Sequence, residues 1–385
     1  MHEITINRST HRFLREQDPA LQERTHEGAM VMAPSLGLRF SGINATMEAL
    51  LPLMAQSIPI ACCGQNLSDQ MPTARLVRWL AHPNRHRWRL WHARRNNDML
   101  LGLVLRYLFR QKLILVWTSA AQRHHTWLTR FCYHRMDAVL ATTEKAASYL
   151  RCPAGVSHHG VNVDAYVPTD RKSEARAKLG IADRRTIGVF GRVRPQKGVG
   201  DFVEAVLAVL PRYPQWQVLF VGQVTPEFAA YQSDLIAKLT AAGLADRVRF
   251  TGFLEDFADL PHWYRAMDAV ACVSRNEGFG VTCLEAMASG VPVLATEAGA
   301  WPDILEHGVD GWLVKPADCA DLATGLEHLC RATPDELQVM GRRARKKVED
   351  RFAIRHESDR LIAFYHQLFE QFGEPRWAES EVVSD

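Results

Sequence analysis

The C-terminal half of the chain alternates short apolar segments with longer amphipathic ones. The apolar segments have the length and composition of buried strands, and the amphipathic ones have the period of helices. Such alternation is typical of a parallel sheet that helices cover on both faces. We expect strands at 186–190, 217–221, 248–250, 269–273 and 290–296, and helices at 201–210, 228–242, 257–266 and 281–288.

The N-terminal half repeats this pattern less regularly, with strands expected at 29–33, 113–117 and 138–141 and a helix at 44–55. The chain is therefore predicted to be an α/β protein of two doubly wound, Rossmann-like domains that face each other across a cleft. Ligands of such sheets bind at the carboxyl ends of the strands. The expected divisions are a polar segment at 1–28, domains at 29–180 and 181–351 joined through polar residues 167–185, and a C-terminal helix that returns to the N-terminal domain, with a tail, at 352–385.

Composition and cysteine usage limit the class of protein. Of the 385 residues, 47% are hydrophobic and 23% are charged, which is typical of soluble globular proteins. The eight cysteines include no Cys-x-x-Cys pair, so we expect free thiols in a reducing compartment and no zinc site. No apolar run approaches the length of a membrane span, and the first residues lack the apolar core of a secretory signal. These features predict a cytoplasmic protein.

Positive charge is concentrated in one part of the chain. Between Gln70 and Met136 there are thirteen lysines and arginines and one acidic residue, Asp98. One interpretation is a solvated basic face, and the other is a surface that meets an anionic partner. Three tryptophans interleaved with these cations favour a membrane interface within region 75–135. They are Trp79, Trp88 and Trp91.

Two carboxylates flank the start of the helix expected at 281–288. Glu277 lies in a glycine-bearing loop after an apolar strand, and Glu285 follows it with seven residues between, about two turns into the helix. Ionised carboxylates accept hydrogen bonds from hydroxyl groups strongly, so the pair suits a polyhydroxylated ligand. The glycines Gly278 and Gly280 allow close approach of the backbone, and the helix that opens at Val281 offers free N–H groups to an anion.

A second loop carries two cations. Gly191 follows the strand at 186–190 and allows a tight turn, after which Arg192 and Lys197 extend from the same loop. Two fixed cations can neutralise a diphosphate, and they stabilise the negative charge that a departing diphosphate gains. Together with the Glu277 loop, this pattern indicates a nucleotide-sugar ligand.

These two motifs carry a family resemblance. Gly-Arg-x4-Lys-Gly and, about eighty residues later, Glu-Gly-Phe-Gly-x4-Glu-Ala-Met-Ala-x-Gly-x-Pro-Val resemble the retaining glycosyltransferases of family 4, which have the GT-B fold. The resemblance implies that Arg192 and Lys197 hold the donor diphosphate, that Glu277 and the backbone after it hold the sugar, and that Glu285 reaches the nucleoside. The implied catalytic residues are Arg192, Lys197 and Glu277. The implied donor-binding residues are Gly191, Arg192, Lys197, Glu277, Gly278, Phe279, Gly280, Val281 and Glu285.

The N-terminal half resembles a narrower group. The segments at 41–46, 91–100 and 118–126 are similar to the lipopolysaccharide core mannosyltransferases of alphaproteobacteria. That group uses GDP-mannose and places mannose on the inner-core Kdo attached to lipid A. The resemblance implies an acceptor that bears phosphates and carboxylates, and an enzyme that is peripheral on the cytoplasmic face of the inner membrane. The candidate acceptor-binding residues are Gly42, Arg94, Arg95, Asn96, His124 and His125.

The sequence departs from the family at one position. Many members carry a histidine at the end of an N-domain strand, where this chain has Trp117, and His124 or His125 is a candidate replacement. No Asp-x-Asp motif occurs, so we expect neither a metal ion nor another cofactor. The sequence offers no convincing nucleophile for a covalent intermediate, and the family resemblance implies a same-face transfer instead.

Other classes of protein fit less well. One alternative is a family 4 enzyme that uses a UDP- or ADP-hexose, and another is a non-catalytic two-lobed protein that binds sugar or nucleic acid. A nicotinamide dehydrogenase would need Gly-x-Gly-x-x-Gly after its first strand, and the loop at Gly191 supplies only one of these glycines.

Overall fold

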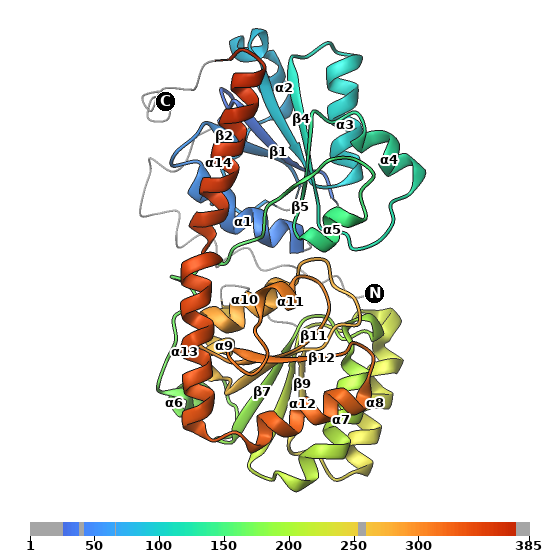
Figure 1. The fold of residues 1–385 in the computed structure, drawn as a ribbon, viewed down its shortest axis with the longest axis vertical. Helices are drawn as coiled ribbons and strands as arrows, with labels where there is room; N and C mark the ends of the chain where they lie inside the picture. The colour runs from blue at the N-terminus through green and yellow to red at the C-terminus, as the bar shows by residue number, and fades with distance from the viewer. Residues whose placement is uncertain (1–25, 38–41, 66, 253–258, 375–385) are drawn as a thin grey trace, which may run out of the picture. The chain divides into compact units, whose positions relative to one another are not determined.

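The computed structural model describes residues 26–37, 42–65, 67–252 and 259–374, and it contains two parallel β-sheets of six strands each (Figure 1). Helices connect successive strands in both sheets, so the predicted α/β architecture is confirmed. Most of the predicted polar segment 1–28, the first two residues of the helix expected at 257–266, and the tail after 374 lie outside the described residues.

The first sheet has the strand order β2-β1-β3-β4-β5-β6. The pairs β1–β2, β1–β3, β3–β4 and β5–β6 run parallel, and β1 lies between β2 and β3. The strands are β1 (Val31–Ser35), β2 (Ile60–Gly64), β3 (Arg89–Ala93), β4 (Leu113–Ser119), β5 (Ala138–Ala141) and β6 (Gly155–Val156). The accompanying helices are α1 (Gly42–Met54), α2 (Leu76–Ala81), α3 (Asn96–Tyr107), α4 (Trp127–Tyr133) and α5 (Glu144–Ser148).

Two of the three tryptophans predicted to favour a membrane interface are core residues instead. Trp79 and Trp91 are completely buried, and their indole N–H groups donate to the carbonyl oxygens of Ala29 (2.7 Å) and Asp98 (2.8 Å). Trp88 is half-buried and packs edge-on against Phe372, with 4.7 Å between ring centroids. The prediction based on these three rings was wrong, because spacing among cations did not reveal that Trp91 belongs to an inner strand.

The second sheet has the order β12-β11-β10-β7-β8-β9. Its strands are β7 (Arg185–Phe190), β8 (Trp216–Val221), β9 (Val248–Gly252), β10 (Ala269–Cys272), β11 (Val293–Thr296) and β12 (Gly311–Val314). Its helices are α6 (Lys172–Lys178), α7 (Val199–Val209), α8 (Ala229–Ala241), α9 (Leu260–Ala266), α10 (Val281–Ala288), α11 (Trp301–Ile304), α12 (Cys319–Arg331) and α13 (Pro334–Arg351). The last helix of the described residues is α14 (Ile354–Gln371).

Both faces of the second sheet are buried. Successive side chains of β10 alternate between the faces, so Val270 packs into one hydrophobic cluster and Ala271 into the other. Residues of α10 and α13 complete the first cluster, and residues of α7, α8 and α12 complete the second. This two-sided burial explains why the strands of this half read as continuous apolar runs.

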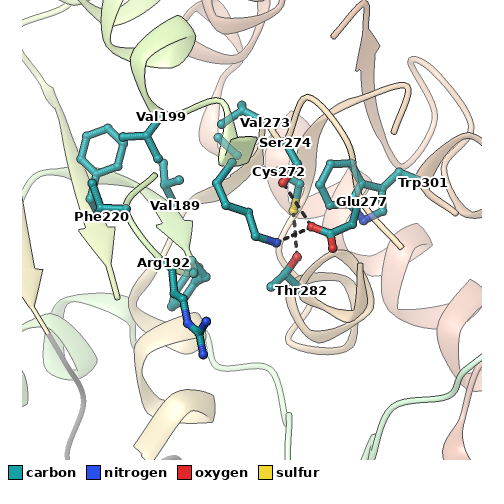
Figure 2. Close-up of a pocket in the computed structure, with 15 residues that line it drawn as sticks. Val189, Arg192, Val199, Phe220, Cys272, Val273, Ser274, Glu277, Thr282 and Trp301 are labelled. Atoms are coloured by element: carbon teal, nitrogen blue, oxygen red, sulfur yellow. Dashed lines mark hydrogen bonds and ion pairs between the residues drawn. The ribbon is translucent and has the colours of Figure 1, made fainter. Parts of the chain in front are cut away.

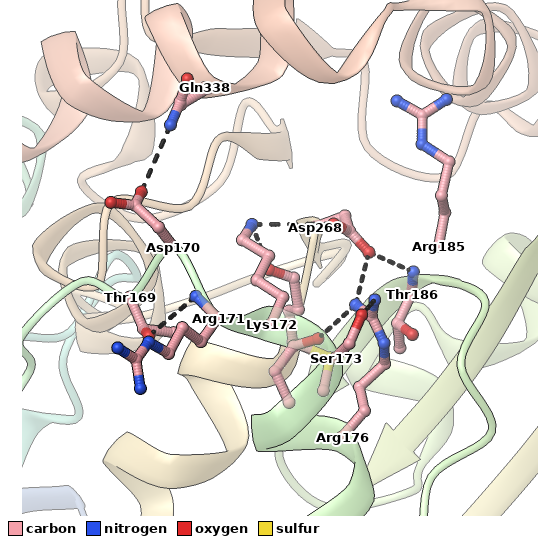
Figure 3. Close-up of polar contacts among 12 residues, drawn as sticks. Thr169, Asp170, Arg171, Lys172, Ser173, Arg176, Arg185, Thr186, Asp268 and Gln338 are labelled. Atoms are coloured by element: carbon pink, nitrogen blue, oxygen red, sulfur yellow. Dashed lines mark hydrogen bonds and ion pairs between the residues drawn. The ribbon is translucent and has the colours of Figure 1, made fainter.

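The segment expected to be a polar connection, 167–185, contains the helix α6. Its Arg176 donates to the carboxylates of Asp268 (3.1 Å) and Asp183 (2.8 Å), as Figure 3 shows in part. Asp268 also accepts from the backbone N–H of Thr186 at 2.7 Å, and the Lys172 ammonium donates to the carbonyl oxygen of Met267 at 2.7 Å. Burial lowers the pKa of Lys172. These contacts fix the amino ends of β7 and β10 beside each other.

The chain divides into two compact units that interleave along the sequence. Unit 1 consists of Met1–Trp117, Arg135–Asp137 and Ile362–Asp385, and unit 2 consists of Thr118–His134 and Ala138–Leu361. The domain boundaries expected from the sequence stay a prediction. None of the helices in the described residues combines the length and apolar character needed to cross a membrane.

Candidate active site

The predicted donor residues gather where the second sheet reverses its strand order. The strand β7 lies between β8 and β10, and later strands are added on the β10 side. In open α/β sheets, such a switch point leaves a crevice outside the carboxyl ends of the two strands. The loop from Gly191 to Lys197 follows β7, and the loop from Val273 to Gly280 follows β10. Two motifs about eighty residues apart thus meet at one edge.

The loop after β7 ends at a glycine, Gly198, which precedes the first residue of α7. Pro195–Lys197 form the 3-10 helix η4, and Gly198 then takes a left-handed conformation with φ of 66° before α7 begins. A Cβ atom at Gly198 would lie 1.7 Å from the carbonyl oxygen of Val273. Only glycine therefore allows the two loops to touch at this point. This contact places Lys197, the residue before Gly198, beside the loop that follows β10.

Glu277 is held by three donors (Figure 2). The Lys197 ammonium pairs with Oε2, and the Ser274 hydroxyl donates to the same oxygen at 3.2 Å. The backbone N–H of Gly278 lies 3.2 Å from Oε1. Among the described residues Oε2 has two donors and Oε1 has one, so Oε1 has the greater capacity to accept from a ligand hydroxyl.

One pocket brings together four of the predicted residues: Gly191, Arg192, Lys197 and Glu277. Arg192 is exposed, and its guanidinium is apart from the Glu277 carboxylate in Figure 2. The pocket is also lined by Cys272, whose burial raises the pKa of its thiol to about 12. That thiol stays protonated at neutral pH, so it is not an activated nucleophile.

Glu285 lies in α10, in a different environment from that of Glu277. The hydroxyl of Tyr166 donates to Oε1 at 3.0 Å, and the hydroxyl of Tyr264 donates to Oε2 at 2.8 Å. Burial raises the pKa of Glu285, and these two hydrogen bonds oppose the shift. The ring of Tyr264 stacks on Phe190 with 3.9 Å between centroids. The carboxylate is therefore fixed from both sides.

The backbone between the two glutamates is shaped by Trp301. Its indole N–H donates to the carbonyl oxygen of Gly280 at 2.8 Å, and Gly280 has φ of 87°. The neighbouring Ala300 N–H donates to the carbonyl oxygen of Phe279 at 3.0 Å. Val281 then begins α10. The start of α11 thus fixes the loop that the sequence predicts to hold the sugar.

The ring of Phe279 is 4% exposed and meets His159 edge-on, with 5.0 Å between centroids. The Nδ1 atom of His159 lies 2.9 Å from the carboxylate of Glu357, which also accepts from the Gly160 N–H at 2.7 Å. These contacts connect the Glu277 loop to the first turn of α14.

A further ion pair connects the two loops of the site. Arg275 donates through two nitrogens to the carboxylate of Asp201 in the first turn of α7, at 2.6 and 2.7 Å. The Arg275 N–H also donates to the carbonyl oxygen of Gln196 at 3.0 Å. Sequence reasoning missed this pair, together with Tyr166, Tyr264, Ser274 and Trp301. These residues are either far in sequence from their partners or belong to no recognised motif. Tyr166, for example, lies 119 positions from Glu285.

Four predicted acceptor residues lie in unit 1, at the switch point of the first sheet between β1 and β3. Arg94 and Arg95 follow β3, Asn96 begins α3, and Gly42 begins α1. The Arg95 guanidinium donates to the Asn44 side chain at 2.6 Å, and Asn44 in turn donates to the Ser35 hydroxyl at 3.0 Å.

The buried carboxylate of Asp98 organises the same turn. It accepts from the backbone N–H groups of Leu36 (3.3 Å), Arg94 (3.2 Å) and Arg95 (2.9 Å). Burial raises the pKa of Asp98, and these hydrogen bonds oppose the shift. The one acidic residue of the basic region is therefore structural.

The two candidate histidines lie in unit 2, and each has an aromatic neighbour. His124 is exposed and meets Tyr149 edge-on at 5.2 Å between centroids. His125 meets Tyr133 at 5.9 Å, and its Nε2 atom lies 3.3 Å from the Ser119 hydroxyl. Burial lowers the pKa of His125, with the charges of Arg123 and His124 adding to the shift.

Comparison with known proteins places the chain in a family. Residues 184–332 match the family described as "Glycosyl transferases group 1". The lipopolysaccharide core biosynthesis mannosyltransferase LpcC of Rhizobium leguminosarum bv. viciae is 38% identical over 342 residues, which cover 88% of this chain and 96% of that protein. LpsB of Rhizobium meliloti, which carries the same description, is 37% identical over 345 residues, covering 88% and 97%. The chain belongs to the group 1 glycosyltransferases.

Solved structures agree with the fold of this glycosyltransferase. Alr3699/HepE of Anabaena in complex with UDP has a TM-score of 0.75 at 20% identity, covering 88% of this chain and 99% of that one. Sucrose-phosphate synthase of Thermosynechococcus elongatus has a TM-score of 0.71 at 20% identity, covering 89% and 99%. At these identities the likeness concerns the fold alone, and it identifies the GT-B fold expected from the sequence.

A metal ion in a protein is held by ligand groups that lie close together. Within the described ranges, no three or more His, Cys, Asp and Glu side chains group closely enough to hold one. The Glu277 carboxylate, in the same pocket as Arg192 and Lys197, already pairs with Lys197. Metal independence stays a prediction.

Proposed function

We propose that this glycosyltransferase moves mannose from GDP-mannose to the inner-core Kdo of lipopolysaccharide, at the cytoplasmic face of the inner membrane. The observation that carries the proposal is the 38% identity, across nearly the whole length of both chains, to a lipopolysaccharide core mannosyltransferase. The pairing of Lys197 with Glu277 at the switch point supports it, because this arrangement suits a sugar diphosphate.

The donor is held by residues of both loops in this proposal. The Lys197 ammonium has three N–H donors, so it can keep Glu277 as a partner while donating to a phosphate oxygen. Arg192 supplies a second cation from the same pocket. Glu277 accepts through Oε1 from sugar hydroxyls, beside the backbone of Gly278 to Val281, and Glu285 accepts from the ribose.

The proposed transfer breaks the bond between the anomeric carbon and the β-phosphate oxygen of the donor. A new bond forms from an acceptor hydroxyl oxygen to the same face of that carbon, and the hydroxyl proton passes to an oxygen of the departing GDP. Negative charge grows on the diphosphate as the bond breaks, so Arg192 and Lys197 stabilise the transition state more than the bound donor. The configuration at the anomeric carbon is retained.

The acceptor is proposed to meet Arg94 and Arg95, because a guanidinium group matches the geometry of carboxylates and phosphates. Asn96 and Gly42 lie at the same switch point of the first sheet, and His124 and His125 are further candidates from unit 2. Since Kdo carries a carboxylate, this chemistry supports an anionic glycolipid acceptor. An acceptor of this kind would hold the enzyme at the membrane surface.

A donor screen tests the proposal. The purified enzyme would be given GDP-mannose, UDP-glucose or ADP-glucose with Kdo-lipid A as acceptor, and the product would be identified by mass spectrometry. We expect addition of one hexose from GDP-mannose only. Transfer from UDP-glucose or ADP-glucose but not from GDP-mannose would overturn the choice of donor.

Binding of GDP can be measured separately by calorimetry. Loss of the Lys197 charge-assisted hydrogen bond in Lys197→Ala should weaken GDP binding by about tenfold or more. The control Lys346→Ala removes an exposed lysine that pairs with Asp350, and it should bind GDP normally. Unchanged binding in Lys197→Ala would contradict the diphosphate role.

A further inference from the structure

The helix α3 is apolar on two opposite sides. Its inner side is packed against the first sheet: Met99 is completely buried, and a Cβ atom added at Gly102 would lie 2.7 Å from the ring of Trp91. Its outer side carries Leu100, Val104, Tyr107 and Leu108, all of which are exposed. The spacing of these four residues places them in one stripe along the helix. A helix that only covers a sheet would have polar residues there.

The exposed apolar side chains are concentrated rather than scattered. Among the described residues, twelve large hydrophobic side chains are exposed, and eight of them lie between residues 100 and 131. Leu108 and Phe109, where α3 ends, are 71% and 61% exposed. Single exposed apolar residues are ordinary, but a grouped set marks an interaction surface.

A second stripe of the same kind lies on α4. Trp127 is 71% exposed, and Leu128 and Phe131 are also exposed on this helix. The helix α4 belongs to unit 2 and α3 to unit 1, so each stripe is considered by itself. Both combine aliphatic and aromatic side chains, which suits the boundary between lipid headgroups and acyl chains.

Cations accompany the stripe of α3. Arg110 and Lys112 are exposed directly after Phe109. Arg106 is different, because it pairs with Asp137. The one acidic residue between Gln70 and Met136, Asp98, is buried. The surface therefore offers apolar insertion and positive charge together, which is complementary to a bilayer that contains anionic lipids.

We propose that the outer face of α3, continued by Phe109, Arg110 and Lys112, docks on an anionic lipid bilayer. In this arrangement Leu108, Tyr107 and Phe109 enter the interfacial layer, and Arg110 and Lys112 contact lipid phosphates. The inference rests on the proposed function only in its choice of a membrane as partner, since a lipid-anchored acceptor requires the enzyme to work at one.

Vesicle co-sedimentation of the full chain tests the docking surface. Vesicles of phosphatidylcholine with phosphatidylglycerol should bind the enzyme, and vesicles of phosphatidylcholine alone should bind it at least about tenfold less tightly. The double variant Leu108→Glu, Phe109→Glu should lose at least about tenfold in binding to the anionic vesicles. The control Ile236→Glu changes an exposed apolar residue of α8 and should bind like the wild type.

A second variant tests the charge. Arg110→Gln together with Lys112→Gln should weaken binding to anionic vesicles and reduce its dependence on salt, because both cations lose their attraction to lipid phosphates. All variants should bind GDP in calorimetry like the wild type, since none of the changed residues lies in the donor pocket.

Three results would overturn the docking proposal. The first is that the Leu108→Glu, Phe109→Glu variant binds anionic vesicles as tightly as the wild type does. The second is that the wild type does not bind anionic vesicles. The third is that light scattering shows a dimer of the wild type, which this variant abolishes without a change in vesicle binding. Failure of the proposed function would appear differently, as vesicle binding with no transfer from GDP-mannose.

Discussion

Glu277 is the residue on which the proposed chemistry depends. Its carboxylate takes hydrogen bonds from Lys197, Ser274 and Gly278, and one oxygen keeps capacity for a ligand. Replacing Glu277 with Gln removes the charge while keeping the shape of the side chain. We expect kcat to fall by about a hundredfold or more, because an interaction that orients the reacting sugar is lost.

The control for this prediction is Glu297→Gln, which changes an exposed carboxylate in the loop after β11. That variant should retain wild-type kcat, and circular dichroism of both variants should match the wild type. A kcat within about threefold of the wild type for Glu277→Gln would contradict the assignment.

Glu285 allows a prediction about stability and pH. Burial raises the pKa of this carboxyl group above its ordinary value, so the folded chain binds the proton more firmly than the unfolded chain. The free energy of unfolding then falls as pH rises from the ordinary pKa through the folded pKa. As pH rises above the ordinary pKa of a glutamate, about 4, we expect the stability difference to shift in favour of Glu285→Gln. Urea unfolding at several pH values measures it.

A carboxyl group with the opposite shift provides the control. Hydrogen bonds from the N–H and hydroxyl of Thr333 lower the pKa of Glu336. Its contribution to stability is therefore present above the ordinary pKa and is lost as pH falls. The difference between the wild type and Glu336→Gln should move in favour of the wild type as pH rises. Parallel curves for the two variants would refute the environment assigned to Glu285.

At the scale of elements, the site depends on contact between the loops after β7 and β10. Gly198 makes that contact possible, since its φ of 66° and its closeness to the Val273 carbonyl oxygen both require glycine. Gly198→Ala should lower the free energy of unfolding and weaken GDP binding, because Lys197 must move with its loop. Thermal unfolding and calorimetry give the two readouts.

Gly180→Ala separates the two causes. Gly180 has a similar φ of 62°, but a Cβ atom there would meet nothing within 4 Å. Its replacement should cost about 1 kcal/mol of stability from the left-handed backbone alone and leave GDP binding unchanged. Equal effects of the two substitutions on stability and binding would show that loop contact is not what Gly198 provides.

Elements of the second sheet were predicted from sequence more completely than those of the first. Strands such as β10 are apolar along their length, because helices bury both faces. The strand β3 was not predicted, since it contains Arg89 and His92. Both are buried through specific partners: Arg89 lies over the Trp79 ring at 3.9 Å, and His92 Nδ1 lies 2.6 Å from the Tyr365 hydroxyl. Such partners cannot be read from local composition.

The helix α13 was also not predicted, although its start has a recognisable signal. Thr333 and Glu336 form a capping box, with Pro334 at the first helical position. Within the site, the motifs predicted that Lys197 and Glu277 would be close, but not the tyrosines that hold Glu285. Motifs identify residues that face a ligand, whereas the residues behind them are chosen by packing.

For the whole molecule, each sheet has a switch point, and candidate site residues lie at both. The donor residues follow β7 and β10, and Arg94 to Asn96 follow β3 beside β1. Within the second sheet, the order of strands thus explains why the loops after β7 and β10, remote in sequence, lie beside each other. It also explains why the alternation of strands and helices was more informative about function than overall composition was.

The charges available to a nucleotide sugar lead to a last prediction, on metal ions. A donor diphosphate carries negative charge that either a divalent cation or protein cations must offset. Arg192 and Lys197 lie together in the donor pocket, and the sequence has no Asp-x-Asp motif to hold a divalent ion. We expect activity in EDTA to stay within about twofold of that in Mg²⁺ or Mn²⁺, with a divalent-dependent glycosyltransferase in the same assay as the control for chelation. Strict dependence on added metal would mean that Arg192 and Lys197 do not suffice to hold the diphosphate.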